Sequence, residues 1–203
     1  MFDTNTFAEI IALAQEAGIE PATLLAVAEV ESGGRALYHI KGVQEPAIRF
    51  EGHYFDRRLS GRVRDQARKA GLSSPEAGRV RNPKTQSERW LLLERAMFIH
   101  KKAALESTSW GLGQVMGAHW EWLGYGSVDE LVAEARNSVG GQIGLMLNFI
   151  DKAGLKTALQ AKDWRSFARR YNGPAFARNQ YDTRMATAYE RWNKSLHHLA
   201  KTA

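Results

Sequence analysis

A glutamate at the end of a predicted helix has the surroundings of a general acid. Residues 21–32 have helical periodicity, and one apolar stripe of this segment consists of Leu24, Val27, Ala28 and Glu31. Glu31 also lies in the last helical turn, where unpaired carbonyl groups disfavour an anion. Burial and the helix end should therefore both raise the pKa of Glu31, so that it stays protonated near neutral pH as a general acid must.

Glu29 is the alternative acid on the same helix. It points about 200° away from Glu31, so only one of the two side chains can face a given cleft. The plain structural alternative is that Glu31 is an exposed acid hydrogen-bonded to the following turn. Because a Glu-Ser-Gly match is common by chance, other segments must decide between these interpretations.

Two further segments suit the binding of an extended ligand. Residues 109–117 read Ser-Trp-Gly-Leu-Gly-Gln-Val-Met-Gly, in which small residues alternate with an aromatic ring and an amide. Residues 171–174 read Tyr-Asn-Gly-Pro and end a helix with a phenol, an amide and a tight turn, and Tyr181 follows. Each segment alone fits an ordinary helix start or C-cap. Their combination in this order is specific to a binding site for an extended ligand.

The three segments resemble the signatures of the lysozyme superfamily branch that contains goose-type lysozymes and lytic transglycosylases. The chain is more closely similar to the phage N-acetylmuramidase endolysin family. The family pattern has Val-Glu-Ser, Phe-Glu-Arg-His, Ser-Trp-Gly-Leu-Phe-Gln-Ile-Met-Gly, and Phe-Ala-Arg-Arg-Tyr-Asn-Gly-Pro leading to Tyr-Asp. The corresponding segments here are residues 30–32, 50–53, 109–117, 167–174 and 181–182.

Several positions depart from this family pattern. Gly52 replaces an arginine, Gly113 replaces an aromatic residue, and Arg49 replaces an aliphatic one. The two glycines are expected to remove a sugar or packing contact, but neither removes the acid. We expect no separate peptidoglycan-binding module of the kind found in some relatives, so any affinity for the cell wall is expected to reside in the catalytic domain.

The resemblance implies that the substrate is peptidoglycan and that the β-1,4 bond between N-acetylmuramic acid and N-acetylglucosamine is cleaved. Glu31 would protonate the glycosidic oxygen, and Glu51 is the candidate second carboxylate because it matches the Phe-Glu segment. A structural ion pair between Glu51 and an arginine is the alternative, and both interpretations stay open. Glu106 and Asp182 are weaker candidates for the same role.

The resemblance also implies a set of substrate contacts. These are Ser109, Trp110, Gln114, Met116, Tyr171, Asn172 and Tyr181. We expect Trp110 to offer a flat face to a sugar ring, whereas Trp120, Trp122 and Tyr125 are expected in the core. The six histidines lack metal-ligand spacing, so neither a metal nor a cofactor is expected.

Helices are expected to position these residues. The 203 residues show helical periodicity almost throughout, with caps predicted at Ser87, Ser127 and Asp163 and short strands at 37–40 and 47–50. The predicted fold class is all-α and lysozyme-like, with one small β-hairpin beside the active-site cleft. We expect a single catalytic domain over 1–203 with a basic lobe around 57–86.

The net charge of +6 and the pI of about 9.6 favour anionic partners. The absence of cysteine excludes a disulfide framework and a thiol nucleophile. Two other functions remain open: a lytic transglycosylase, and a basic nucleic-acid-binding module, for which no recognition motif supports a specific nucleic acid partner.

The C-terminal segment from Tyr189 has a basic amphipathic pattern with two interpretations. It could contact anionic outer-membrane lipopolysaccharide, or it could dock Trp192 and Leu196 on the core with its lysines in solvent. No signal peptide or transmembrane segment is predicted. We expect a monomer that is synthesised in the host cytoplasm and acts on the periplasmic cell wall after release.

Overall fold

A computed structural model describes residues 2–202. It is mainly helical, as predicted. The helices are α1 (Thr4–Glu16), α2 (Pro21–Ser32), α3 (Gly52–Arg58), α4 (Gly61–Lys69), α5 (Gln86–Glu106), α6 (Trp120–Leu123), α7 (Val128–Asn137), α8 (Val139–Lys152), α9 (Lys156–Gln160), α10 (Trp164–Tyr171), α11 (Tyr181–Thr202) and the 3-10 turn η1 (Gly117–His119). The strands are β1 (Leu37–Ile40), β2 (Val43–Pro46), β3 (Ile48–Phe50), β4 (Thr108–Trp110) and β5 (Val115–Met116).

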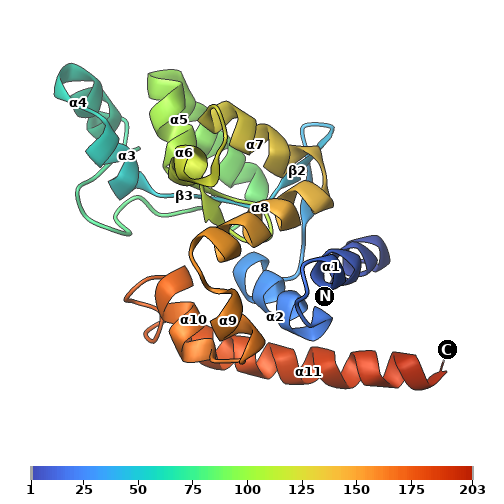
Figure 1. Cartoon of the computed structure of the whole chain (residues 1–203). Helices are drawn as coiled ribbons and strands as arrows, with labels where there is room; N and C mark the ends of the chain where they lie inside the picture. Colours follow the sequence, from blue (N-terminus) through green and yellow to red (C-terminus); the bar gives the residue numbers. More distant parts are fainter. Residues whose placement is uncertain (1, 203) are drawn as a thin grey trace.

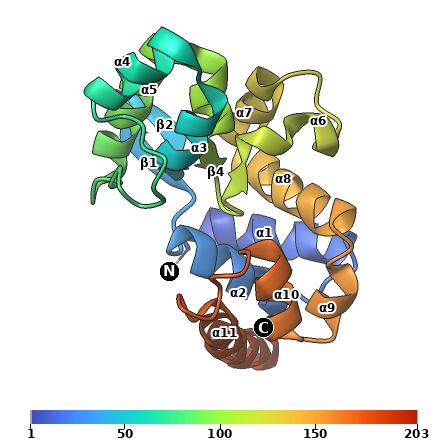
Figure 2. The ribbon, with the colours of Figure 1, turned by 90° about the vertical axis from the view of Figure 1, so that its left-hand side faces the viewer.

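The elements form two lobes joined by α8 (Figure 1). We call α1, α2 and α9–α11 the helical lobe, and the strands with α3–α7 the mixed lobe. Each lobe has its own core of buried apolar side chains. Helix α8 runs from one lobe to the other (Figure 2) and contributes Met146 to the helical core and Leu145 to the mixed core.

Helix α2 is the central helix of the helical lobe. Pro21 suits its first position, and Gly33 ends it with a left-handed φ of 74°. Every residue from Ala22 to Ala28 is buried, rather than the one-sided stripe that the sequence predicted. The difference arises because α1 and α11 both pack on α2. The last turn, which carries Glu31, is where this buried helix reaches solvent.

The strands form two antiparallel sheets, one more than the single hairpin that the sequence predicted. Strands β1 and β2 pair in a hairpin, while β3, β4 and β5 form a second sheet with Ile48 opposite Trp110 and Ser109 opposite Met116. The predicted strands near 37–40 and 47–50 are present. Local periodicity missed the second sheet because it pairs β3 with a segment far along the chain.

Helix N-caps are largely where the sequence predicted them. The side chains of Ser127 and Asp163 accept hydrogen bonds from the amides of Glu130 and Ser166. The prediction for α5 was wrong, because Thr85 rather than Ser87 is its N-cap. Thr85 and Glu88 form a reciprocal capping box there, which satisfies two backbone donors.

A buried carboxylate fastens the basic segment around residues 57–86 to the mixed lobe. Asp56 accepts two hydrogen bonds of 2.7 Å from the Arg68 guanidinium and one of 3.1 Å from the Ser73 hydroxyl. The hydrogen bonds from Arg68 hold the pKa of Asp56 below its ordinary value despite its burial. The segment is therefore a folded part of the lobe, with Ala67 and Leu72 in the mixed core.

Helix α11 docks on the helical lobe with its apolar side. Trp192 is buried, with its ring centroid 6.0 Å from that of Phe2 and 5.6 Å from that of Phe7. Leu196 packs partly against the same core. The docking interpretation of the C-terminal pattern is thus confirmed. Within residues 2–202, no helix combines the length and apolar character needed to cross a bilayer.

Candidate active site

A cleft of about 670 Å³ lies between the two lobes. The helical lobe contributes the ends of α2 and α10 and the start of α11, and the mixed lobe contributes β3, β4, β5 and η1. Eight of the predicted site residues line it: Glu31, Glu51, Ser109, Gln114, Met116, Tyr171, Asn172 and Tyr181. Segments that are far apart in the chain therefore meet in one cavity.

Glu31 projects from the last turn of α2 into this cleft. The Asn172 amide nitrogen donates a hydrogen bond of 2.6 Å to Glu31 Oε1. Burial raises the pKa of Glu31 to about 7, although the hydrogen bond from Asn172 and the charge of Arg184 oppose the rise. Near neutral pH a large fraction of Glu31 therefore carries the proton that a general acid delivers.

The end of α10 lies beside Glu31 on the wall that the helical lobe contributes. The Tyr171 hydroxyl donates a hydrogen bond of 2.6 Å to the Gly113 carbonyl, and burial raises the pKa of Tyr171 well above its ordinary value. Asn172 Oδ1 is buried and has no hydrogen-bond partner within residues 2–202. This oxygen is therefore an unsatisfied acceptor on the same side chain whose amide nitrogen holds Glu31.

The turn between β4 and β5 forms the floor beside Glu31. Gln114 has a positive φ of 46°, and its side-chain amide donates to the carbonyls of Gly111 at 2.8 Å and Ala47 at 3.3 Å. The Ser109 hydroxyl lies 3.1 Å from Met116 Sδ, directly across the strand pair. The β4–β5 turn thus places three predicted contact residues, Ser109, Gln114 and Met116, on one wall of the cleft.

The two glycine departures from the family pattern have packing explanations. A Cβ on Gly113 would lie 2.6 Å from Met146 Cβ and 2.9 Å from the Tyr171 hydroxyl. A Cβ on Gly52 would lie 2.5 Å from Val80 Cγ2. Neither position has room for a larger residue, because neighbouring side chains already fill the space.

Glu51 lies across the cleft, at the junction of β3 and α3. Asn82 forms hydrogen bonds of 3.0 and 2.7 Å with both backbone groups of Phe50, which fixes the end of β3. Glu51 accepts a hydrogen bond of 2.7 Å from Arg49 Nε, and its other oxygen lies 3.6 Å from His53 Nδ1. The side chain therefore combines both predicted features, a place in the cleft and an ion pair with an arginine.

The prediction that Trp110 stacks on a sugar is wrong. Its side chain is 1% exposed, its ring packs edge-on against Trp90 at 5.8 Å, and its indole nitrogen donates to the Leu105 carbonyl. The reason is strand alternation, since Ser109 faces the cleft and the next residue of β4 must point into the core.

Another tryptophan has the exposure that was expected of Trp110. Trp122, predicted in the core, is 45% exposed. Its ring lies 5.7 Å from His119 and 5.5 Å from Phe149, and Phe149 lies 5.1 Å from Tyr171. This row of rings leads from the cleft outward, and His119 and Phe149 are cleft residues that the sequence did not predict. Nothing local in the sequence distinguished them from core residues.

The cleft also contains arginines that the sequence did not predict there. They are Arg49, Arg89, Arg170 and Arg184. Arg184 lies three residues after Tyr181, on the same helical face, and this spacing was the available signal. It donates a hydrogen bond of 3.2 Å to the Val30 carbonyl, which holds its charge beside the turn that carries Glu31.

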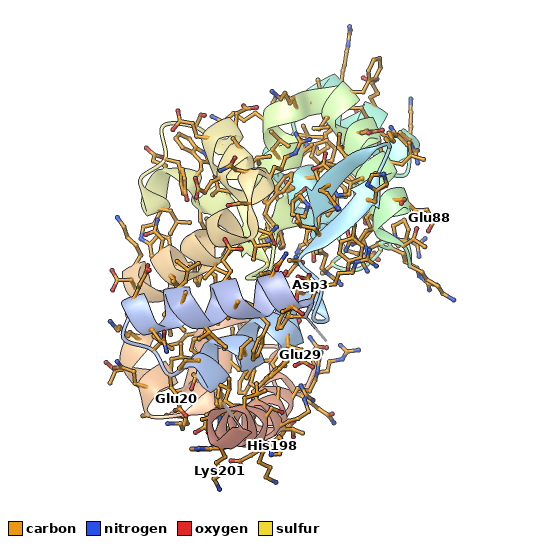
Figure 3. The ribbon with its side chains drawn as sticks, turned by 90° about the vertical axis from the view of Figure 1, so that its right-hand side faces the viewer. Asp3, Glu20, Glu29, Glu88, His198 and Lys201 are labelled. Carbon is orange, nitrogen blue, oxygen red and sulfur yellow. The ribbon has the colours of Figure 1, made fainter. Side chains whose placement is uncertain are left out.

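The rival carboxylates have other roles. Glu29 faces α11 (Figure 3), where it pairs with Arg191 and accepts a hydrogen bond of 2.6 Å from Trp192 Nε1. Glu106 accepts a hydrogen bond of 2.9 Å from Trp120 Nε1 and pairs with Arg58. Neither of these two, nor Asp182, lines the cleft.

A mainly helical two-lobed fold with a carboxyl group of raised pKa in the cleft has the architecture of a lysozyme-like enzyme. The family description N-acetylmuramidase matches residues 20–193. The chain belongs to this family of peptidoglycan-cleaving enzymes. It is also similar to the crystal structure of the Burkholderia AP3 phage endolysin, with a TM-score of 0.75 and 32% identity over 93% of this chain and 71% of the endolysin chain. No curated protein sequence matches the chain.

Proposed function

We propose that the chain is an endolysin that hydrolyses the β-1,4 bond between N-acetylmuramic acid and N-acetylglucosamine. The observation that carries this proposal is Glu31, a cleft carboxyl group whose pKa is raised to about 7. Membership of the N-acetylmuramidase family and the similarity to a phage endolysin support the choice of substrate.

In the proposed mechanism, Glu31 gives its proton to the glycosidic oxygen while the bond from that oxygen to C1 of the muramic sugar breaks. Glu51 stabilises the oxocarbenium-like transition state, positions the water whose oxygen bonds to C1 and accepts the proton that this water loses, and proton exchange with solvent then restores both carboxyl groups. Asn172 holds the Glu31 carboxyl group through its side-chain amide nitrogen. Ser109, Gln114, Met116 and Tyr181 complete the walls against the glycan.

Digestion of purified peptidoglycan with mass spectrometry of the products tests this proposal. A hydrolase leaves muramic reducing ends. A lytic transglycosylase leaves anhydro ends that are lighter by one water. Reducing ends on N-acetylmuramic acid are expected. Anhydro ends, or reducing ends on N-acetylglucosamine, would refute the reaction or the bond assigned here.

The pH dependence should report the protonation of Glu31. Since the acid form is required, kcat/KM is expected to fall as the pH rises through about 7. Arg184 lowers the pKa of Glu31, so Arg184→Gln should move the fall in kcat/KM to higher pH. Rate profiles of the two proteins on soluble glycan measure the shift. Arg165→Gln, which removes an exposed cation outside the cleft, is the control. A fall in kcat/KM that moves to lower pH in Arg184→Gln would contradict the assignment.

We further propose that both lobes act together as one catalytic domain that itself supplies the affinity for the wall. The cleft, whose walls come from both lobes, supports this proposal. We propose a monomer, which light scattering of the purified protein tests. Synthesis in the host cytoplasm, followed by release to the periplasmic wall, is proposed from the resemblance to phage endolysins.

The exposed cations of α11 are proposed to contact anionic lipopolysaccharide. Trp192 and Leu196 face the core, so that charge rather than apolar insertion would drive the contact. Lys194→Gln combined with Lys201→Gln is expected to reduce killing of intact Gram-negative cells by externally added protein while hydrolysis of isolated peptidoglycan continues. Colony counts and turbidity assays measure the two effects. Undiminished killing by the double variant would exclude this role.

A further inference from the structure

A second hollow of about 510 Å³ adjoins the cleft. Arg35, Tyr38, His39 and Lys84 line it, and it shares Ser32 and Arg89 with the cleft. The two cavities therefore meet beside the last turn of α2. Because Ser32 directly follows Glu31, the hollow opens next to the proposed acid.

The hollow is cationic. No carboxylate is among the residues that line it, and Arg35, Lys84 and Arg89 form no ion pair within the described chain. Asp3 and Glu88 accept hydrogen bonds from Thr6 and Thr85 at helix N-termini, and neither forms an ion pair with Arg35, Lys84 or Arg89. The three cations of the hollow are therefore not neutralised by an ion pair within the described chain.

Both arginines of the hollow are held in place by neutral partners. Arg35 Nε donates a hydrogen bond of 2.9 Å to the Leu37 carbonyl, and its guanidinium lies 4.6 Å from the centre of the Tyr38 ring. Arg89 donates to the carbonyls of Pro83 at 2.9 Å and Ile48 at 3.2 Å. Their charged groups are thus oriented in advance, which lowers the entropic cost of binding an anion.

Peptidoglycan carries anions on the sugar whose bond is cleaved. In the proposed reaction the muramic sugar that loses its C1–O bond lies at Glu31. The lactyl group on C3 of that same sugar bears the stem peptide, whose side chains and terminus carry carboxylates. A stem peptide leaving the cleft at this sugar therefore starts within reach of the cationic hollow.

We propose that the hollow binds the carboxylates of the peptide attached to the muramic sugar at the cleavage site. The enzyme would then prefer peptide-bearing glycan to glycan strands from which the peptides have been removed. This inference rests on the proposed muramidase function and specifies its substrate class. Arg35 and Lys84 are the specificity residues, and Arg89 connects the hollow with the cleft.

The test compares three substrates prepared from one peptidoglycan: the native polymer, the polymer with its carboxylates amidated, and glycan stripped of peptides by an amidase. The wild-type protein is expected to cleave the native polymer with a kcat/KM about tenfold above the other two. The double variant Arg35→Gln with Lys84→Gln should lose most of this preference. Raising the ionic strength should weaken the preference of the wild-type protein, since salt screens exposed charges.

A matched control removes the same charge elsewhere. Lys152→Gln with Arg165→Gln changes two exposed cations that line neither cavity, and its preference should equal that of the wild-type protein. Equal cleavage of all three substrates by the wild-type protein would overturn the inference while leaving muramidase activity intact. A preference that the Arg35 and Lys84 variant retains, with an unchanged Tm, would also overturn it. Failure of the wild-type protein to cleave any of the three would instead refute the proposed function.

Discussion

Glu31→Gln is expected to reduce kcat on peptidoglycan by at least about 100-fold while the protein stays folded. Glutamine keeps the size of the side chain and can still accept the hydrogen bond from Asn172. It cannot deliver a proton to the glycosidic oxygen. Turbidity loss of purified peptidoglycan measures the rate, and circular dichroism verifies the fold. A folded variant that clears peptidoglycan near the wild-type rate would refute the assignment.

The same substitution should raise the stability of the protein. The pKa of Glu31 is about 7 in the folded chain against an ordinary value of 4.5, so ionisation of this group opposes folding. Stability is unaffected below the unfolded pKa and falls as the pH rises towards the folded pKa. Above pH 7 the glutamine variant should therefore gain up to about 3 kcal/mol in free energy of unfolding. Urea unfolding at pH 4 and pH 8 measures the gain, which should be close to zero at pH 4 and near its full size at pH 8.

Glu29→Gln provides the matched control on the same helix. Glu29 does not line the cleft and is bound to Arg191 and Trp192 on the opposite side. Its replacement should lower stability and leave the activity per folded molecule near that of the wild-type protein. The reverse pattern, with an inactive Glu29 variant and an active Glu31 variant, would identify Glu29 as the acid.

Glu51→Gln is expected to give the second largest effect, a fall in kcat of about 100-fold with little change in KM. The substitution removes the negative charge opposite Glu31 that would stabilise the oxocarbenium-like transition state. The glutamine can still accept the hydrogen bond from Arg49 and keep the end of β3 in place. Charge loss should therefore affect catalysis more than folding.

Paired measurements of kcat and Tm separate the two interpretations of Glu51. A large loss of kcat at nearly constant Tm supports the catalytic role. A lower Tm with full activity per folded molecule would show that Glu51 serves only the ion pair with Arg49. The Arg49→Gln variant is the companion control, since it removes the ion pair but keeps the carboxylate in the cleft.

The sequence by itself determined the helices and the order of the site motifs. Signals such as Pro21 at the first position of α2 and Gly33 after its end are local, because they depend on backbone conformation within a few residues. Glu31 could be identified as the candidate general acid in the same way, since its helical face and its place in the last turn follow from spacing alone. The family motifs then placed most of the contact residues.

Only the tertiary structure decided which side chains face the cleft. Trp110 is buried because strand β4 pairs with the distant β3, and that pairing fixes which face of β4 lies in the core, whereas Trp122 is exposed on α6. The contact between Glu31 and Asn172 joins residues 141 positions apart. The cationic hollow likewise combines Arg35 with Lys84, which are brought together by the fold. Such contacts depend on the packing of whole elements, and local propensity carries no information about them.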